Sequence, residues 1–339
     1  MAQSKRNVSI QLIRIVAMFM IVTDHMLHYC NIPFKSFIIQ ITNSGVFIFL
    51  FISGFLFGQK TITNWKQWFL KRGIRVLIPF WIFILIDFII EGIIWHDLTI
   101  KQVVVYVFNL QGIFGTRSAT NPLWFLTLIM ICYIITPLLS KLKNIELSKL
   151  VKVISIILFF TVQILCAYFF NFGMSHGHTI GWCLLAIGFY GLAFFAGNSI
   201  LKNNISIKHI LLVTIIAIVT GGLVVVAHKY IDGTRIYEII SWYGYVVVDF
   251  WIISVVYAIG KTKVALSCKR VIDFFDGISY EFYLVHSLII NLIVYYLSKY
   301  LSMKTYILIT LVLSMIGAII IKYISKPIIK IMNKKMIEE

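Results

Sequence analysis

The chain has 339 residues, of which 60% are hydrophobic and 13% are charged, and its mean hydropathy is +0.94. A water-soluble domain of this length needs more surface charge, so the composition excludes a soluble globular protein and indicates an all-α, polytopic membrane protein. The formal net charge of +17 would fit a nucleic-acid-binding protein, but the positions of the charges account for it differently.

Hydrophobic runs long enough to cross a bilayer as helices recur along the chain. The first run is not followed by a small-residue cleavage site, so it is predicted to be a span and not a removed signal peptide. Because the number of predicted spans is even, both termini are expected on the same side of the membrane. The ten predicted spans are residues 8–28, 37–57, 76–95, 122–140, 151–170, 180–200, 208–228, 238–259, 278–297 and 304–325.

Lys and Arg concentrate on one side of this topology. Of the 30, 22 lie in the N-terminus, the C-terminal tail and every second loop, whereas the opposite loops contain only seven. Cytoplasmic loops carry the excess of Lys and Arg, so both termini are predicted to be cytoplasmic and loops 96–121 and 229–237 to lie outside. This asymmetry explains the basic composition, so membrane lipids and not nucleic acid are expected as partners.

Two of the connections are more than turns. Segment 60–75 mixes Trp65 and Trp68 with Lys and Arg, which is typical of a basic amphipathic helix in the membrane interface. Segment 96–121 is expected to fold over the outer mouth of the bundle. No connection is long enough for a separate soluble domain, so residues 1–339 are expected to form one integral-membrane domain. The five cysteines form no C-x-x-C pair, which indicates neither a disulfide framework nor a zinc site.

The first predicted span contains Arg14 and His25 with ten residues between them. Eleven helical steps bring the two side chains to within about 20° of one another around the helix and separate them by about 16 Å along its axis. An arginine within hydrocarbon is costly and usually marks a site or a water-filled cavity. A cation near one side of the membrane and an imidazole near the other suggest a site whose two substrates arrive from opposite sides.

His25 is the leading candidate for a catalytic base, because imidazole transfers protons near neutral pH. Adjacent helical residues do not face each other, so Asp24 is expected to lie nearer to His28 than to His25. The alternative is that all three are polar residues at the end of a span. Arg14 is interpreted either as recognising an anionic group from the cytoplasm or as an arginine that snorkels or pairs with an acidic residue of span three.

The ninth predicted span contains His286, with Glu281 and Tyr283 near it in sequence. An intramembrane histidine is either a functional residue or a buried histidine that is hydrogen-bonded to another helix. Three acidic residues within spans are interpreted either as counter-charges or as proton carriers: Asp87, Glu91 and Asp249.

A cationic cluster of Lys71, Arg72 and Arg75 follows the second predicted span. It is interpreted either as ordinary positive-inside charge beside lipid phosphates or as a docking site for a multiply phosphorylated donor.

Five motifs in this order resemble the integral-membrane enzymes of acyltransferase family 3, and the resemblance covers nearly the whole chain. Gln11 stands where many members have an acidic residue, and Asp24 precedes the histidine where some members have a second one. The motifs are the Arg14-x10-His25 pair, FIFLFISGFLFG with Ser53 and Gly54, FLKRGIRVLIPFW with Pro79, PLWFLTLIMICYIITPLL with Trp124 and Phe125, and a Ser-Tyr-x-x-Tyr-x-x-His block of Ser279, Tyr280, Tyr283 and His286.

The resemblance implies transfer of an acyl group, most often acetyl, from cytoplasmic acyl-CoA to a hydroxyl of a cell-surface or lipid-linked glycan. Acyl-CoA is then a co-substrate, no tightly bound cofactor or metal is expected, and the location is the plasma membrane of a bacterium. The implied catalytic residues are Arg14, His25 and His286, the donor-binding residues are Arg14, Lys71, Arg72 and Arg75, and the substrate-binding residues are Trp124, Glu281 and Tyr283.

His286 is expected either to orient the acceptor or to donate a hydrogen bond to the thioester carbonyl. The alternative function is a proton-coupled transporter or flippase for a glycan or small solute, because such carriers also use intramembrane Arg, Asp, Glu and His. A non-catalytic assembly protein of a glycan machine is a second alternative. The ordered set of motifs favours the enzyme.

Overall fold

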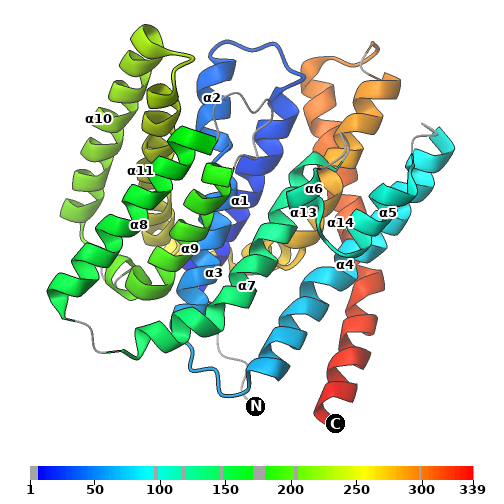
Figure 1. Ribbon diagram of the computed structural model, residues 1–339. Helices are drawn as coiled ribbons and strands as arrows, with labels where there is room; N and C mark the ends of the chain where they lie inside the picture. The colour runs from blue at the N-terminus through cyan, green and yellow to red at the C-terminus, as the bar shows by residue number, and fades with distance from the viewer. Residues whose placement is uncertain are drawn as a thin grey trace. The chain divides into compact units, whose positions relative to one another are not determined.

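The computed structural model describes residues 7–94, 98–115, 120–145, 148–170, 180–201, 205–297 and 299–338. Within these ranges the chain forms helices and no strand, which confirms the predicted all-α class (Figure 1). In the described part of the chain, seven helices are long and apolar enough to cross a membrane: α1 (Val8–Leu27), α4 (Trp65–Ile94), α7 (Trp124–Lys143), α10 (Ile207–Ile231), α11 (Arg235–Ile259), α13 (Lys269–Leu297) and α14 (Met303–Glu338).

The remaining described elements are α2 (Lys35–Thr42), α3 (Gly45–Gly58), α5 (Ile100–Val107), α6 (Gln111–Phe114), the 3-10 helix η1 (Asn121–Leu123), α8 (Lys149–Phe170), α9 (Ile180–Ile200) and α12 (Lys263–Ser267). The predicted spans 151–170 and 180–200 correspond to α8 and α9. The number of ten spans and the side of each terminus stay predictions.

The second predicted span, 37–57, is interrupted. α2 ends at Thr42 and α3 begins at Gly45, so the prediction of one continuous helix was wrong. The hydroxyl of Ser44 donates a hydrogen bond to the backbone carbonyl of Ile41, at 2.9 Å. Serine side chains that bind nearby backbone compete with helical hydrogen bonding, which explains a break that hydropathy alone does not indicate.

The predicted interfacial helix at 60–75 is not a separate element. Its helical part is the start of α4, which begins at Trp65 after Asn64 accepts a hydrogen bond from the backbone N–H of Gln67, at 2.9 Å. α4 then continues past residue 75 into the predicted third span. Lys and Arg are good helix formers, so the change from basic to apolar sequence does not end the helix.

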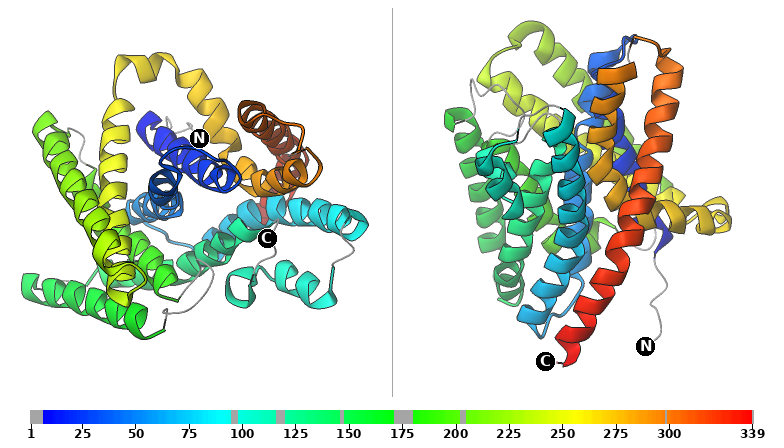
Figure 2. Two further views of the ribbon diagram at one scale, coloured as in Figure 1. Left: turned by 90° about the horizontal axis from the view of Figure 1, so that it is seen from above. Right: turned by 90° about the vertical axis from the view of Figure 1, so that its right-hand side faces the viewer.

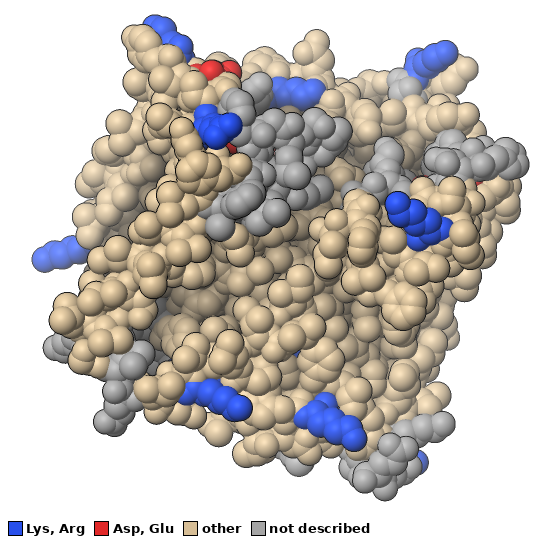
Figure 3. Space-filling model, viewed as in Figure 1, with Lys and Arg blue, Asp and Glu red and all other residues tan. Residues whose placement is uncertain are grey.

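The chain divides into two compact units. The first unit comprises Met1–Ala17, Gln40–Lys60 and Ile135–Ile272, and the second comprises Met18–Ile39, Thr61–Ile134 and Asp273–Glu339. Both units contain apolar helices of membrane-spanning length. The face drawn in Figure 3 consists mostly of uncharged side chains, and none of the described side chains of α10 is buried. Such an apolar, outward-facing helix is expected to contact lipid.

Within the first unit, α3 and α9 pack at backbone distance. A Cβ atom added to Gly54 would lie 2.1 Å from the carbonyl oxygen of Tyr190, and one added to Gly58 would lie 2.2 Å from that of Phe194. Only glycine allows two helix backbones to approach this closely, as in many membrane helix pairs. The Gly54 position of the family-like motif is therefore a packing position.

Replacing Gly54 with alanine is expected to destabilise the protein, because the new methyl group collides with a backbone oxygen that has no rotamer to adopt. Overpacking of this kind typically costs about 1–3 kcal/mol. The matched control is Gly222→Ala on α10, where an added Cβ meets nothing within 4 Å. Thermal unfolding in detergent should show a lower Tm for Gly54→Ala only, and equal Tm values would contradict this packing.

Within the second unit, α13 is the central helix. Its residues from Glu281 to Leu288 are all buried. α14 lies against α4 and also against α13, where the Nζ of Lys322 donates to the carbonyl of Gly277 at 2.7 Å (Figure 2). α13 therefore positions its side chains against several helices at once.

The predicted sides of the membrane can be tested with single cysteines at two exposed positions, Asp232 and Asn144. In a background without the five native cysteines, Asp232→Cys is expected to react with a membrane-impermeant maleimide in intact cells, because it lies in a loop predicted to be outside. Asn144→Cys is expected to react only after the cells are permeabilised. The reverse pattern would invert the topology.

Candidate active site

Two imidazole rings from distant parts of the sequence meet in the second unit. The ring centroids of His25 on α1 and His286 on α13 are 5.3 Å apart, with an angle of 39° between the rings. The His25 side chain is 24% exposed, whereas His286 is completely buried. The two predicted catalytic histidines, 261 residues apart in sequence, therefore lie side by side, one open and one enclosed.

The tautomer of neutral His286 follows from one hydrogen bond. Its Nδ1 lies 2.6 Å from the backbone carbonyl oxygen of Tyr283, and a carbonyl can only accept, so Nδ1 carries the hydrogen. In the neutral ring Nε2 then has a free lone pair. Within the described part of the chain this buried nitrogen has no hydrogen-bond partner. Neutral His286 can therefore accept a hydrogen bond at Nε2 but cannot donate one there.

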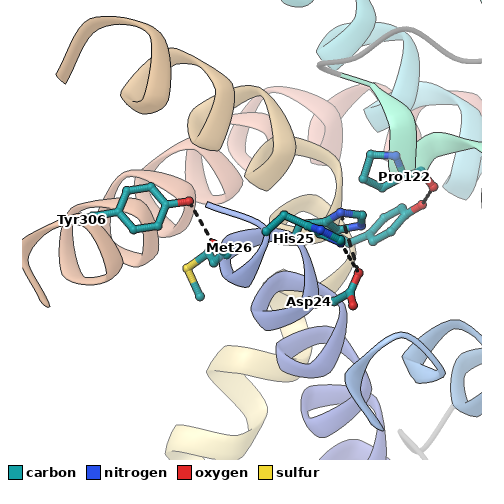
Figure 4. Close-up of polar contacts among 7 residues, drawn as sticks. Asp24, His25, Met26, Pro122 and Tyr306 are labelled. Carbon is teal, nitrogen blue, oxygen red and sulfur yellow. Dashed lines mark hydrogen bonds and ion pairs between the residues drawn. The ribbon is translucent and has the colours of Figure 1, made fainter. Parts of the chain in front are cut away.

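Asp24 lies between two histidines. One of its carboxylate oxygens is 4.0 Å from Nδ1 of His25 and 3.9 Å from Nε2 of His28, and the first of these contacts is drawn in Figure 4. Asp24 was expected to lie nearer to His28 than to His25, and the two distances are almost equal. The Cβ atoms diverge around the helix, but the two side chains bend toward each other. The Asp24 side chain is 8% exposed, so its charge acts on His25 with little screening by water.

His28 competes weakly for this carboxylate. Partial burial lowers the pKa of His28, and the positive charge of Lys35 lowers it further. The Nζ of Lys35 is held in place by a hydrogen bond to the backbone carbonyl of His28, at 2.9 Å. Near neutral pH His28 is therefore uncharged and does not neutralise Asp24.

Tyr283 fixes α13 to the segment that precedes α7. Its hydroxyl donates a hydrogen bond to the carbonyl of Pro122, and its ring meets the ring of Phe125 edge-on, at 5.7 Å between centroids. The ring of Tyr283 is also 5.8 Å from that of His286. Trp124, which is buried, begins α7 between Pro122 and Phe125. Of the predicted substrate-binding residues, Tyr283 therefore lies beside the imidazole pair, although its hydroxyl is already engaged.

Part of the predicted external segment 96–121 is folded back onto the start of α7. The side chain of Asn109 donates to the carbonyl of Leu126 at 3.1 Å, and that of Gln111 donates to the carbonyl of Leu123 at 2.9 Å. These buried amides hold α6 and η1 in place. The segment therefore packs against the first turn of α7, where Trp124 lies.

The predicted cationic cluster lies where α4 meets α7 and α13. Arg72 and Arg75 are within electrostatic range of the Tyr133 hydroxyl, and the ring of Trp68 packs edge-on against that of Tyr133, at 5.8 Å. Nearby, the hydroxyl of Tyr280 donates to a backbone carbonyl of α4 at 2.7 Å. Lys71 and Arg72 are half-buried and Arg75 is exposed, so the cluster is open to a charged ligand.

The cluster and the imidazole pair are linked by α13. Tyr280 lies beside the cluster, and His286 follows it by six residues, a rise of about 9 Å along the helix. The cluster on α4 therefore lies beside α13, and His286 follows about 9 Å further along α13.

Other predicted residues lie elsewhere. Glu281 is buried within electrostatic range of Lys322, on the side of α13 near α14, about 140° around the helix from His286.

Arg14 is half-buried and belongs to the first unit. Asp87 and Glu91 are buried on α4, and Asp249 is buried beside the Ser44 hydroxyl. The sequence did not indicate the Tyr283–Pro122 hydrogen bond, although the spacing of Tyr283 and His286 marked both residues.

The model of a known family, described as an acyltransferase domain, matches residues 7–323. The match extends from the start of α1 into α14 and so includes the imidazole pair, Asp24 and the cationic cluster. No significant match to the chain was found among curated proteins or among solved structures.

Proposed function

The chain belongs to the family 3 acyltransferases, and we propose that it transfers an acyl group, first of all acetyl, from cytoplasmic acyl-CoA to a hydroxyl of a cell-surface or lipid-linked glycan. The observation that carries the proposal is the His25–His286 pair, in which two imidazoles with different exposure lie 5.3 Å apart. Imidazole is the side chain best suited to proton transfer at neutral pH, and acyl transfer to an alcohol needs a base.

His25 acts as the base in this proposal. The acceptor hydroxyl oxygen attacks the thioester carbonyl carbon while its proton passes to His25. The resulting tetrahedral intermediate collapses, the C–S bond breaks, and the thiolate of CoA takes the proton from the His25 imidazolium. The products are the acylated hydroxyl and free CoA. Asp24, within ion-pair distance of His25, stabilises the imidazolium that forms.

The cationic cluster receives the donor. CoA carries several phosphate charges, and guanidinium groups bind phosphate through paired hydrogen bonds. Arg72 and Arg75 lie near the buried Tyr133, and the half-buried ring of Trp68, which packs on Tyr133, offers a surface for a planar base. From there the thioester end reaches along α13 toward His286.

A carrier is the second candidate function. Three carboxylates are buried within apolar helices, Asp87, Glu91 and Asp249, and proton-coupled carriers use such residues. The family assignment favours the enzyme. The two functions differ in whether a covalent bond of the donor is broken.

Asp24→Asn is expected to lower acyl transfer about tenfold, because the neutral amide no longer stabilises the imidazolium that forms on His25. Asp24→Glu should restore part of the rate. The matched control is His28→Gln, which also removes a group beside Asp24. An unchanged rate in Asp24→Asn would exclude the role of this carboxylate.

The proposal is tested by mass spectrometry of surface glycans from cells that express the wild-type chain, the His25→Ala variant or neither. A mass increase by one acyl group, about 42 Da for acetyl, is expected only in glycans from cells with the wild-type chain. Glycans of identical mass in all three cultures would contradict acyl transfer to a glycan.

A further inference from the structure

The imidazole pair contains more hydrogen-bond acceptors than one attacking hydroxyl can use. In neutral His286, Nδ1 donates to the Tyr283 carbonyl, so Nε2 is an acceptor. In His25, the nearby Asp24 carboxylate favours a hydrogen on Nδ1, so Nε2 is again the acceptor. Two lone pairs therefore belong to rings whose centroids are 5.3 Å apart.

A single alcohol has only one proton to give. If His25 takes the proton of the hydroxyl that is acylated, the lone pair of His286 remains for another donor. His286 is fully buried, and the aromatic rings of Tyr283 and, beyond it, Phe125 lie on one side of it. The Tyr283 hydroxyl is bound to Pro122 and does not supply a donor. A buried acceptor that lacks a partner is costly, so the site favours a ligand that provides one.

We propose that His286 is a specificity-determining residue, which accepts a hydrogen bond from a second hydroxyl of the acceptor, vicinal to the hydroxyl that is acylated. This inference rests on the proposed acyl transfer and narrows its acceptor to a vicinal diol. Rings at this separation are too close for two independent ligands. They are well placed for two neighbouring oxygens of one ligand, each about 2.8 Å from its nitrogen.

The same hydrogen bond argues against a role of His286 as a donor to the thioester carbonyl. While His286 is neutral, its one N–H is engaged with the Tyr283 carbonyl, so the ring has no hydrogen to give to the thioester carbonyl oxygen. Of the two roles expected from the sequence, orientation of the acceptor is the one that this tautomer supports. Changes at His286 should therefore affect the apparent KM for the acceptor and leave the KM for acyl-CoA unchanged.

The test uses membranes that contain the full-length protein, acetyl-CoA labelled in the acetyl group, and the glycan already present in those membranes. Glycan labelling is measured with increasing trans-1,2-cyclohexanediol or cyclohexanol, two alcohols that differ by one vicinal hydroxyl. The diol is expected to inhibit at about a fivefold lower concentration than cyclohexanol, the effect of roughly one hydrogen bond.

Three variants test whether the stronger inhibition by the diol depends on the His286 side chain. His286→Leu removes the acceptor atom, so the advantage of the diol should vanish. His286→Gln retains an oxygen that can accept, so part of the advantage should remain. Ser287→Ala, at the adjacent buried position on α13, is the matched control and should retain all of it.

Equal inhibition of the wild-type protein by the two alcohols would overturn the proposal, and so would a preference that persists in His286→Leu. The wild-type comparison does not depend on whether any variant folds. Failure of the proposed function is a different result: no label would reach the glycan in the wild-type membranes even without added alcohol.

Discussion

His25→Ala is expected to reduce the turnover of acyl transfer by about 10²–10⁴-fold, the typical contribution of a positioned general base. The reduction should appear in kcat, because the proton is transferred while the acceptor oxygen attacks the thioester carbon. His25 lies beside His286 and within ion-pair distance of Asp24. Its removal leaves neither neighbour with a base to orient.

The measurement is release of free CoA by the purified protein at saturating acyl-CoA. The matched control is His28→Ala, because His28 lies one turn further along the chain at the same distance from Asp24, outside the imidazole pair. That variant should retain turnover close to that of the wild type. Near wild-type turnover in folded His25→Ala would remove His25 from the reaction.

Arg14→Ala is expected to lower kcat/KM for acyl-CoA by about 10–100-fold, since a hydrogen bond to a charged group contributes roughly 1.5–3 kcal/mol. Arg14 lies on α1, eleven residues before His25, on the part of the helix that is predicted to be nearer the cytoplasm. Arg14→Lys should restore only part of the loss, because an ammonium group lacks the planar fork of guanidinium.

Steady-state rates at varied acyl-CoA and at varied acceptor separate the two substrates. Arg14→Ala should raise KM for the donor and leave KM for the acceptor unchanged. Arg270→Ala, which removes an exposed arginine at the start of α13, is the charge-matched control. Donor kinetics that are the same in Arg14→Ala and in the wild type would show that Arg14 binds no part of acyl-CoA.

Features that depend on local sequence were predictable. α9 spans the predicted residues 180–200, and α8 and α11 begin within a few residues of their predicted starts, because a helix that contacts lipid or apolar neighbours must remain apolar along its length. The pairing of His25 with His286 was expected only through the resemblance to a family. No periodicity in the sequence relates residues that are 261 positions apart.

Features that depend on single side-chain hydrogen bonds were not predictable from hydropathy. The Ser44 hydroxyl ends α2 by binding a carbonyl, and a serine in an apolar run is equally common within an unbroken helix. Asp24 approaches His25 because two side chains bend, which the 100° spacing of their Cβ atoms does not reveal. The role of Gly54 depends on the position of the Tyr190 carbonyl on another helix.

The most direct test of the account uses acetyl-CoA that carries one label in the acetyl group and a second label in the CoA part, added to membranes that contain the wild-type chain and their glycan. The acetyl label is expected to enter the glycan while an equal amount of the second label is released as free CoA, and the His25→Ala variant is expected to do neither. Movement of both labels together, with the thioester intact, would contradict acyl transfer and would identify a carrier.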